Sequence, residues 1–148
     1  MLTPEEVRGV LLPDDYIKAH GVFYEWLADE YYYDEKGVNH YERMFDKPRD
    51  EGGTPFTGLA YAFFDDTEQI SYYIEMKDGY HFGDYVSYYF GSGALCSYHR
   101  FDETEHYCYK WHENGVLKQK TVWDRKDSRK SRVWEYDKNG RLIRETPE

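Results

Sequence analysis

Short runs of alternating apolar and polar residues, separated by turn residues, predict β-strands along most of this chain. One unit recurs, made of two aromatic-rich positions, a short polar turn, a glycine and an apolar residue two places later. Its copies are Tyr31–Gly37, Ala62–Ile70, Ser87–Leu95, Tyr109–Leu117 and Trp134–Leu142. Each copy predicts a β-hairpin, and two of them hold the Asn-Gly pair that tight hairpin turns favour, at 114–115 and 139–140. The copy around Glu68 lacks the glycine, so we expect a longer or strained turn there.

Aligning the copies on their turns produces columns of similar residues. One column holds Tyr33, Phe64, Tyr89, Trp111 and Tyr136, and another holds Ile70, Leu95, Leu117 and Leu142. We interpret these two columns as rows of one buried face. Because neighbours on a strand point to opposite faces, the column of Tyr32, Phe63, Tyr88, Lys110 and Glu135 is expected to face the other way. That second face would expose aromatic rings unless the N-terminal segment covers it.

These elements predict a mostly β fold, an antiparallel sheet of consecutive hairpins within a single domain that spans residues 1–148. Residues 23–145 are expected to form the sheet and residues 1–22 an N-terminal cap segment. A short helical turn is expected near the start, where Thr3 can cap a helix and Pro4 suits its first position. The polar stretch 46–54 is too short for a domain linker.

Composition supports strands and bears on the partner. Aromatic residues make up 20% of the chain, with Tyr 17, and rings with a polar tip suit strands and half-wet surfaces. The net charge of -10 disfavours nucleic acid and anionic membranes, and favours a basic partner. Residues 1–108 hold 22 acidic and 8 basic side chains, against 7 and 11 in residues 109–148, so the two ends should carry opposite fields. We interpret the basic stretch 125–132 as a solvated loop.

The cellular compartment is expected to be the cytoplasm. No apolar run approaches the roughly 20 residues of a membrane span, and the start of the chain lacks the basic and apolar regions of a signal peptide. Cys96 and Cys108 are expected to be reduced, packed thiols, although two cysteines also fit a disulfide bridge.

The segments 55–61, 76–89 and 109–118 resemble bacterial MORN-like repeat proteins, in particular the variant family that includes antitoxin and immunity components of toxin–antitoxin pairs. The resemblance covers residues 55–145 well and 23–54 loosely. It implies a single curved antiparallel sheet of stacked hairpins and a role in binding and neutralising a cognate toxin. The sequence departs from the repeat pattern at Glu68 and in the insertion 125–132.

Candidate catalytic and metal sites are weak. If residues 102–105 form a hairpin loop, Phe101 pairs with His106 and His99 lies opposite Cys108, which supplies two ligands rather than the four of a structural zinc site. The acidic clusters 65–68 and 102–105 lie in turns, where carboxylates are normally solvated rather than held as an acid–base pair. No nucleophile elbow or phosphate-binding glycine loop occurs. We therefore expect no enzyme activity, no metal, no cofactor and no small-molecule substrate.

The expected function is protein binding through an acidic, tyrosine-rich sheet face. The acids would steer a basic toxin or another protein to the face, and the rings would supply contact area. A scaffold or self-associating repeat protein is the alternative, and carbohydrate binding by ring stacking is a third. The candidate contact residues are Tyr32, Asp34, Glu35, Tyr61, Phe63, Asp65, Asp66, Glu68, Tyr72, Asp84 and Tyr88.

Overall fold

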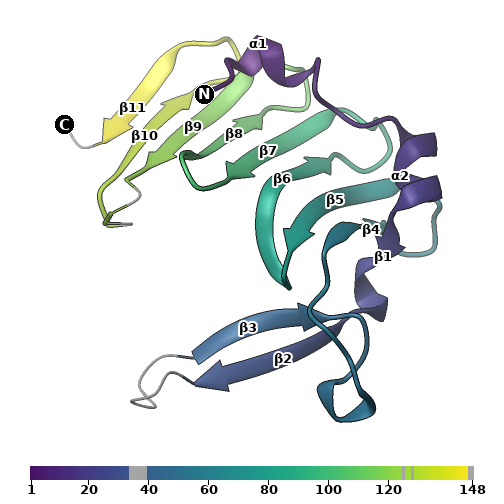
Figure 1. The fold of residues 1–148 in the computed structure, drawn as a ribbon. Coiled ribbons are helices and arrows are strands. Elements are labelled where there is room, and N and C mark those ends of the chain that lie inside the picture. Colours follow the sequence, from purple (N-terminus) through teal and green to yellow (C-terminus); the bar gives the residue numbers. More distant parts are fainter. Residues whose placement is uncertain (34–39, 125, 128, 147–148) are drawn as a thin grey trace.

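The computed structural model describes residues 1–33, 40–124, 126–127 and 129–146 of a mostly β chain (Figure 1). A nine-stranded sheet dominates it, with neighbouring strands in the order β1-β4-β5-β6-β7-β8-β9-β10-β11. These strands are β1 (Val22–Phe23), β4 (Gly58–Phe63), β5 (Ile70–Lys77), β6 (Tyr80–Tyr88), β7 (Leu95–Phe101), β8 (His106–Trp111), β9 (Leu117–Trp123), β10 (Ser131–Tyr136) and β11 (Leu142–Thr146). From β4 onward each strand pairs antiparallel with the next, so consecutive turns build the sheet in chain order.

Two features differ from the single antiparallel sheet that the sequence predicts. The short strand β1 pairs with β4 in parallel, with Val22 opposite Ala60 and Phe23 opposite Tyr61. The first predicted hairpin is not part of the large sheet, because β2 (Ala28–Tyr33) and β3 (His40–Phe45) form a two-stranded sheet of their own, and β3 makes in addition an isolated bridge between Phe45 and Pro55. The predicted turn of that hairpin lies outside the described residues.

The helical elements are short. They are α1 (Pro4–Val7), α2 (Asp14–His20) and the 3-10 turns η1 (Tyr24–Trp26) and η2 (Arg49–Glu51). The helical turn expected near the start is confirmed as α1, which begins with a reciprocal cap. The Glu6 amide donates to the Thr3 hydroxyl at 3.2 Å, and the Thr3 amide donates to the Glu6 carboxylate at 3.1 Å.

The N-terminal segment runs along the outer side of the large sheet, from above β9 to β4 (Figure 1). Val7 of α1 and Ile17 of α2 are fully buried in the main hydrophobic cluster. Most of that cluster comes from one face of the sheet, and its buried members there are Tyr61, Ile70, Tyr73, Val86, Leu95, Tyr98, Tyr107, Tyr109 and Trp111. The segment therefore supplies the second layer that a single sheet needs to bury one of its faces.

Tyrosines suit this interface because their hydroxyl groups satisfy the irregular backbone that lies on them. The Leu12 amide donates to the Tyr73 hydroxyl at 3.1 Å, and the Leu2 amide donates to the Tyr107 hydroxyl at 3.1 Å. The Tyr109 hydroxyl donates to the Leu2 carbonyl at 2.7 Å. A buried loop backbone without such partners would carry unsatisfied polar groups. Much of the tyrosine content of the sheet therefore serves the chain's own N-terminal segment.

The column assignment made from the sequence is partly wrong. Phe63 and Tyr88, which were expected to face away from the core, pack against the main hydrophobic cluster. The reason is that Phe63 is the cross-strand partner of Ile70 and Tyr88 that of Leu95, so these turns are one residue longer than the turns at 114–115 and 139–140. Leu142 was expected to be buried but is exposed on the edge strand β11.

The opposite face of the sheet contacts the β2–β3 hairpin. Tyr72, beside the buried Tyr73 on β5, points to this face, and its ring lies 5.9 Å from that of Tyr24 in η1, whose hydroxyl donates to the Met44 sulfur of β3 at 3.7 Å. Met44 and Met76 are buried here. The hairpin is thus held against the face that the N-terminal segment leaves uncovered.

Gly79 fixes this contact. Replacing Gly79 with alanine is expected to lower the free energy of unfolding by about 1 kcal/mol more than the same replacement at Gly91. Its φ of +83° is a left-handed conformation, and an added Cβ would lie 2.5 Å from the Met44 carbonyl oxygen. The Gly79 carbonyl also accepts the Met44 amide at 2.9 Å. Urea unfolding measures the change, with Gly91→Ala as a control that shares the φ of +83° but meets no atom within 4 Å. An equal loss in both variants would contradict the role of the Met44 contact.

Candidate functional site

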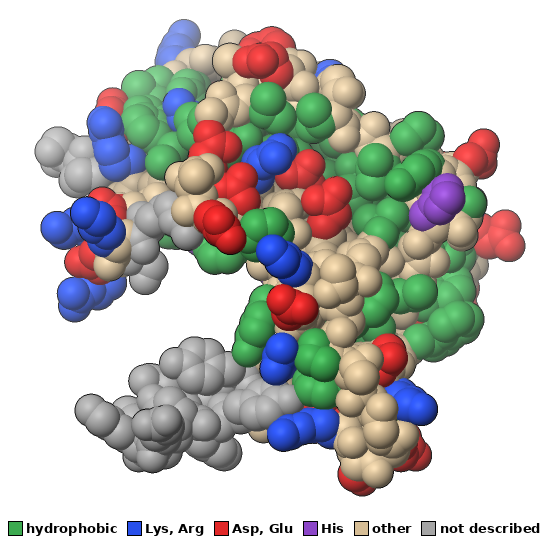
Figure 2. Space-filling model, viewed as in Figure 1, with side chains coloured by type: hydrophobic (Ala, Val, Ile, Leu, Met, Phe, Trp, Pro, Cys, Tyr) green, Lys and Arg blue, Asp and Glu red, His purple; other side chains and the backbone are tan. Residues whose placement is uncertain are grey.

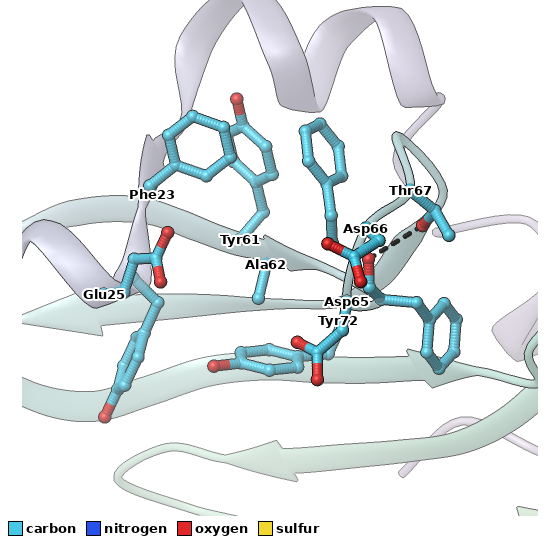
Figure 3. Close-up of a pocket in the computed structure, with 11 residues that line it drawn as sticks. Phe23, Glu25, Tyr61, Ala62, Asp65, Asp66, Thr67 and Tyr72 are labelled. Atoms are coloured by element: carbon cyan, nitrogen blue, oxygen red, sulfur yellow. Dashed lines mark hydrogen bonds between the residues drawn. The ribbon is translucent and has the colours of Figure 1, made fainter.

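A cleft of about 410 Å³ lies at the outer edge of β4, where the sheet meets β1 and η1 (Figure 3). Phe23 and Tyr61 lie on one side of the edge and Tyr72 on the other, with the small Ala62 between them. The lining residues are Phe23, Tyr24, Glu25, Tyr61, Ala62, Phe63, Phe64, Asp65, Asp66, Thr67 and Tyr72. The volume is within the usual range of ligand pockets.

The turn from Phe64 to Gln69 carries the acidic rim of the cleft. The Phe64 amide donates to the Gln69 carbonyl at 2.9 Å, and the Thr67 hydroxyl donates to the Phe64 carbonyl at 2.8 Å (Figure 3). Asp66 has a φ of +59°, which confirms the strain expected where the glycine is missing. These bonds close the turn through backbone groups and Thr67, and leave the exposed carboxylates of Asp65 and Asp66 directed outward.

Aromatic contacts shape the walls of the cleft. The Phe23 ring lies 4.9 Å from that of Tyr61 and 5.3 Å from that of Phe63, in tilted and edge-on arrangements. On the opposite face, the Tyr72 ring lies 5.9 Å from that of Tyr24, and burial raises the pKa of Tyr24 to about 12. Both tyrosines therefore stay neutral at physiological pH. The walls are apolar rings with neutral polar tips.

The cleft brings together five of the predicted contact residues and adds others. Tyr61, Phe63, Asp65, Asp66 and Tyr72 line it. Glu68 is exposed on the same turn but does not line the cleft. Asp34, Glu35 and the side chain of Tyr32 lie outside the described part of the chain.

Besides Phe63, three of the predicted contact residues lie on the face that the N-terminal segment covers. Tyr61 is 7% exposed beneath Phe23, so only part of its ring reaches the cleft. Tyr88 packs against the main cluster, and burial raises its pKa to about 12. Asp84 is 8% exposed and accepts a hydrogen bond from the Tyr98 hydroxyl at 2.9 Å. The prediction that these three side chains present an open tyrosine-rich face is therefore wrong, because the chain itself occupies that face.

Asp84 has an internal electrostatic role. Its carboxylate lies 3.6 Å from the Arg100 guanidinium, and the same guanidinium donates to the Tyr98 hydroxyl at 3.3 Å. Burial raises the pKa of the Asp84 carboxyl, while Tyr98 and Arg100 oppose that shift. A carboxylate that is buried and neutralised in this way contributes little to the steering of a basic partner.

Part of the sheet's opposite face carries a row of histidines. The register confirms the predicted pairs, with His99 opposite Cys108 and Phe101 opposite His106. The Nε2 atoms of His99 and His106 are 2.9 Å apart, and the Trp123 ring stacks on both imidazoles. Within the described part of the chain, no group of three or more His, Cys, Asp or Glu side chains is arranged to hold a metal ion.

The second acidic turn, residues 102–105, stabilises its own backbone. The Asp102 carboxylate accepts the amides of Thr104 and Glu105 at 2.8 and 2.7 Å, which lowers its pKa to about 2. This is an ordinary role of aspartate in a turn, whereas the sequence predicts a carboxylate that is simply solvated.

Both cysteines are free thiols, as expected, and they should differ in reactivity. Cys108 is buried, and desolvation raises its pKa to about 11, so little thiolate is present at pH 8. We expect a thiol reagent such as Ellman's reagent to label the half-buried Cys96 in the native protein at least about tenfold faster than Cys108. The variants Cys96→Ser and Cys108→Ser show which cysteine gives the fast and which the slow phase of labelling. Equal labelling rates in the native protein would contradict the burial of Cys108.

Comparisons with known proteins find no matching family model, no similar curated protein and no similar solved structure. Among the described residues, no helix has both the length and the apolar character to cross a membrane. The functional argument therefore rests on the cleft itself.

Sequence reasoning missed the part of the cleft that comes from residues 23–25. Phe23 enters through the parallel pairing of β1, and Tyr24 and Glu25 through the 3-10 turn that follows it. The aromatic cluster Phe23-Tyr24-Glu25-Trp26 was a visible signal, but its spacing fits a strand as well as a turn.

Proposed function

We propose that this chain is a non-catalytic protein-binding module of the immunity or antitoxin type, and that it neutralises a basic toxin by occlusion. The observation that carries the proposal is the cleft at β4, where aromatic walls and the exposed acids Glu25, Asp65 and Asp66 occur together. Half-buried rings that line a cleft beside charges of one sign suit a partner of opposite charge. A cytoplasmic location and the absence of a cofactor belong to the same proposal.

A recurrent irregularity in the sheet supports the MORN-like part of the proposal. Bulges interrupt the ladder at the same place before every second turn, four times from β4 to β11, and each leaves an aromatic residue opposite an aliphatic one. These pairs are Phe63–Ile70, Tyr88–Leu95, Trp111–Leu117 and Tyr136–Leu142. A repeated hairpin unit accounts for this recurrence.

Co-expression with the protein encoded beside this chain in the genome tests the function. We expect a stable complex on size-exclusion chromatography and rescue of cell growth from that protein's toxicity. The double variant Asp65→Asn/Asp66→Asn should weaken the complex by about tenfold, because it removes two charges from the cleft rim. Absence of both a complex and growth rescue would overturn the proposal.

Self-association remains a second candidate because one edge of the large sheet is open. The edge strand β11 exposes Leu142 (47%) and Ile143 (62%), and unpaired edges readily recruit another strand. Figure 2 shows lysine and arginine side chains gathered near the loop between β9 and β10, at the opposite end of the sheet from the acidic cleft. Light scattering at rising protein concentration tests this candidate, and Ile143→Lys should keep the chain monomeric if β11 is the contact.

A further inference from the structure

The cleft contains an unpaired strand edge. β1 ends at Phe23, opposite Tyr61, whereas β4 continues through Ala62 and Phe63. In the described part of the chain, no strand pairs with these two residues on the side away from β5. Such an edge offers backbone amides and carbonyls to an added strand, which is a recurring mode of peptide recognition.

Side chains beside this edge leave room for one long side chain. Ala62 contributes only a methyl group, while Phe23 and Phe63 lie on one side of the edge and Tyr24 and Tyr72 on the other. The backbone of an added strand would lie in the plane of the sheet between the two sets of rings, and its side chains would point alternately to the two faces, so a flat group would stack on the rings of one face. The site is therefore shaped for a planar head rather than for a branched aliphatic side chain.

The charges at the cleft favour a cation. Figure 3 shows Glu25 at one end of the exposed edge and Asp65 and Asp66 at the other. Among the described residues, no lysine or arginine forms an ion pair with these three acids. The ammonium of Lys18 lies 5.6 Å above the Phe63 ring, which shows that a cation fits beside this wall.

We propose that the cleft takes the side chain of an arginine from an extended segment of a basic protein, and that this segment adds to β4 as a strand beside Ala62 and Phe63. The inference rests on the proposed function and specifies how its partner is recognised. Arginine fits better than lysine, because a planar guanidinium stacks on rings and donates in parallel to carboxylates. The rest of the segment contributes backbone hydrogen bonds.

A short peptide tests this recognition mode without knowledge of the partner. The probe is a capped hexapeptide of alternating valine and threonine with one central arginine, and its control carries citrulline, which keeps the shape and loses the charge. In an NMR titration we expect the arginine peptide to bind about tenfold more tightly and to shift the amide signals of Ala62 and Phe63. Equal affinities, or shifts confined to other strands, would overturn the proposal.

Variants of the chain separate the effect of the acids at the cleft from the effect of the protein's overall negative charge. Asp65→Asn/Asp66→Asn should weaken binding of the arginine peptide by about tenfold and leave the affinity of the citrulline peptide unchanged. Asparagine also tolerates the left-handed backbone at Asp66. Glu103→Gln/Glu113→Gln removes the same charge from exposed positions in other turns and should leave both affinities unchanged.

Lys18 and the peptide backbone provide two further readouts. Lys18→Met removes a neighbouring positive charge and should increase the affinity for the arginine peptide by about two- to threefold. Two peptides are compared, each N-methylated at every second backbone amide. Methylation of the amides that face β4 should abolish binding, whereas methylation of the amides that face away from β4 should leave it intact. Equal tolerance of both methylated sets would overturn strand addition.

The outcome for the peptide and the outcome for the whole partner are distinguishable. Binding of the partner protein with no response to the arginine peptide would overturn the strand-addition mode and leave the proposed function standing. Absence of both would overturn the proposed function together with this inference.

Discussion

Ile17→Ala is expected to lower the free energy of unfolding by about 2–5 kcal/mol, the usual cost of truncating a large aliphatic side chain in a core. Ile17 is fully buried although it belongs to a helix of seven residues, which is too short to be stable by itself. The helix therefore depends on the burial of Ile17 in the main hydrophobic cluster. Thermal and urea unfolding followed by circular dichroism measure the loss.

Val10→Ala is the matched control, because Val10 lies in the same N-terminal segment but is 38% exposed. Its cost should stay within about 0.5 kcal/mol. The Ile17 variant should also expose rings of the covered face and so bind a hydrophobic dye at lower urea concentrations than the parent protein. Similar stability of the two variants would show that the N-terminal segment adds little to the fold.

The local turns of this chain could be predicted from its sequence. The Asn-Gly pairs at 114–115 and 139–140 connect β8 to β9 and β10 to β11, as expected. The pairing of His99 with Cys108 followed from the length of the loop at 102–105. These features depend on residues close in sequence, where turn chemistry fixes the strand register.

The covering of the tyrosine-rich face could not be predicted in the same way. It depends on contacts between residues far apart in the chain, such as the hydrogen bonds of Leu2 with Tyr107 and Tyr109. The sequence of the N-terminal segment predicts a cap, a helical turn and little else, so it does not reveal which face it covers. Alternation along a strand separates two faces, but it does not say which of them receives a distant segment.

The same limit explains the outcome for the candidate contact residues. Asp65 and Asp66 are exposed because they lie in a turn, which the sequence shows directly. Asp84 is on a strand, and its buried carboxylate is held by Arg100, its cross-strand partner, and by Tyr98 on the same neighbouring strand. Acidity alone therefore did not distinguish a surface charge from one used inside the fold.

Acidification from pH 7 to pH 4.5 is expected to remove about 2 kcal/mol of stability through His99. Desolvation, together with the nearby His81, His106 and Lys110, lowers the pKa of His99 from 6.5 to about 4. Since the unfolded chain binds this proton more tightly, the contribution is complete above pH 6.5 and is lost as the pH falls toward 4. Because the imidazole is partly accessible to solvent, the expected loss of stability is smaller than the full value that the lowered pKa of His99 implies.

Carboxylates complicate the total pH dependence, so the measurement is a difference between variants. Burial raises the pKa values of Glu75 and Asp84, so their contribution to the stability of the fold increases as the pH falls. His99→Phe keeps a ring beside Trp123 and removes the titrating group. Between pH 7 and pH 4.5 the variant should therefore lose about 2 kcal/mol less unfolding free energy than the parent protein. A His99→Phe variant that lost as much stability on acidification as the parent would show that His99 is not held in its neutral form by the fold.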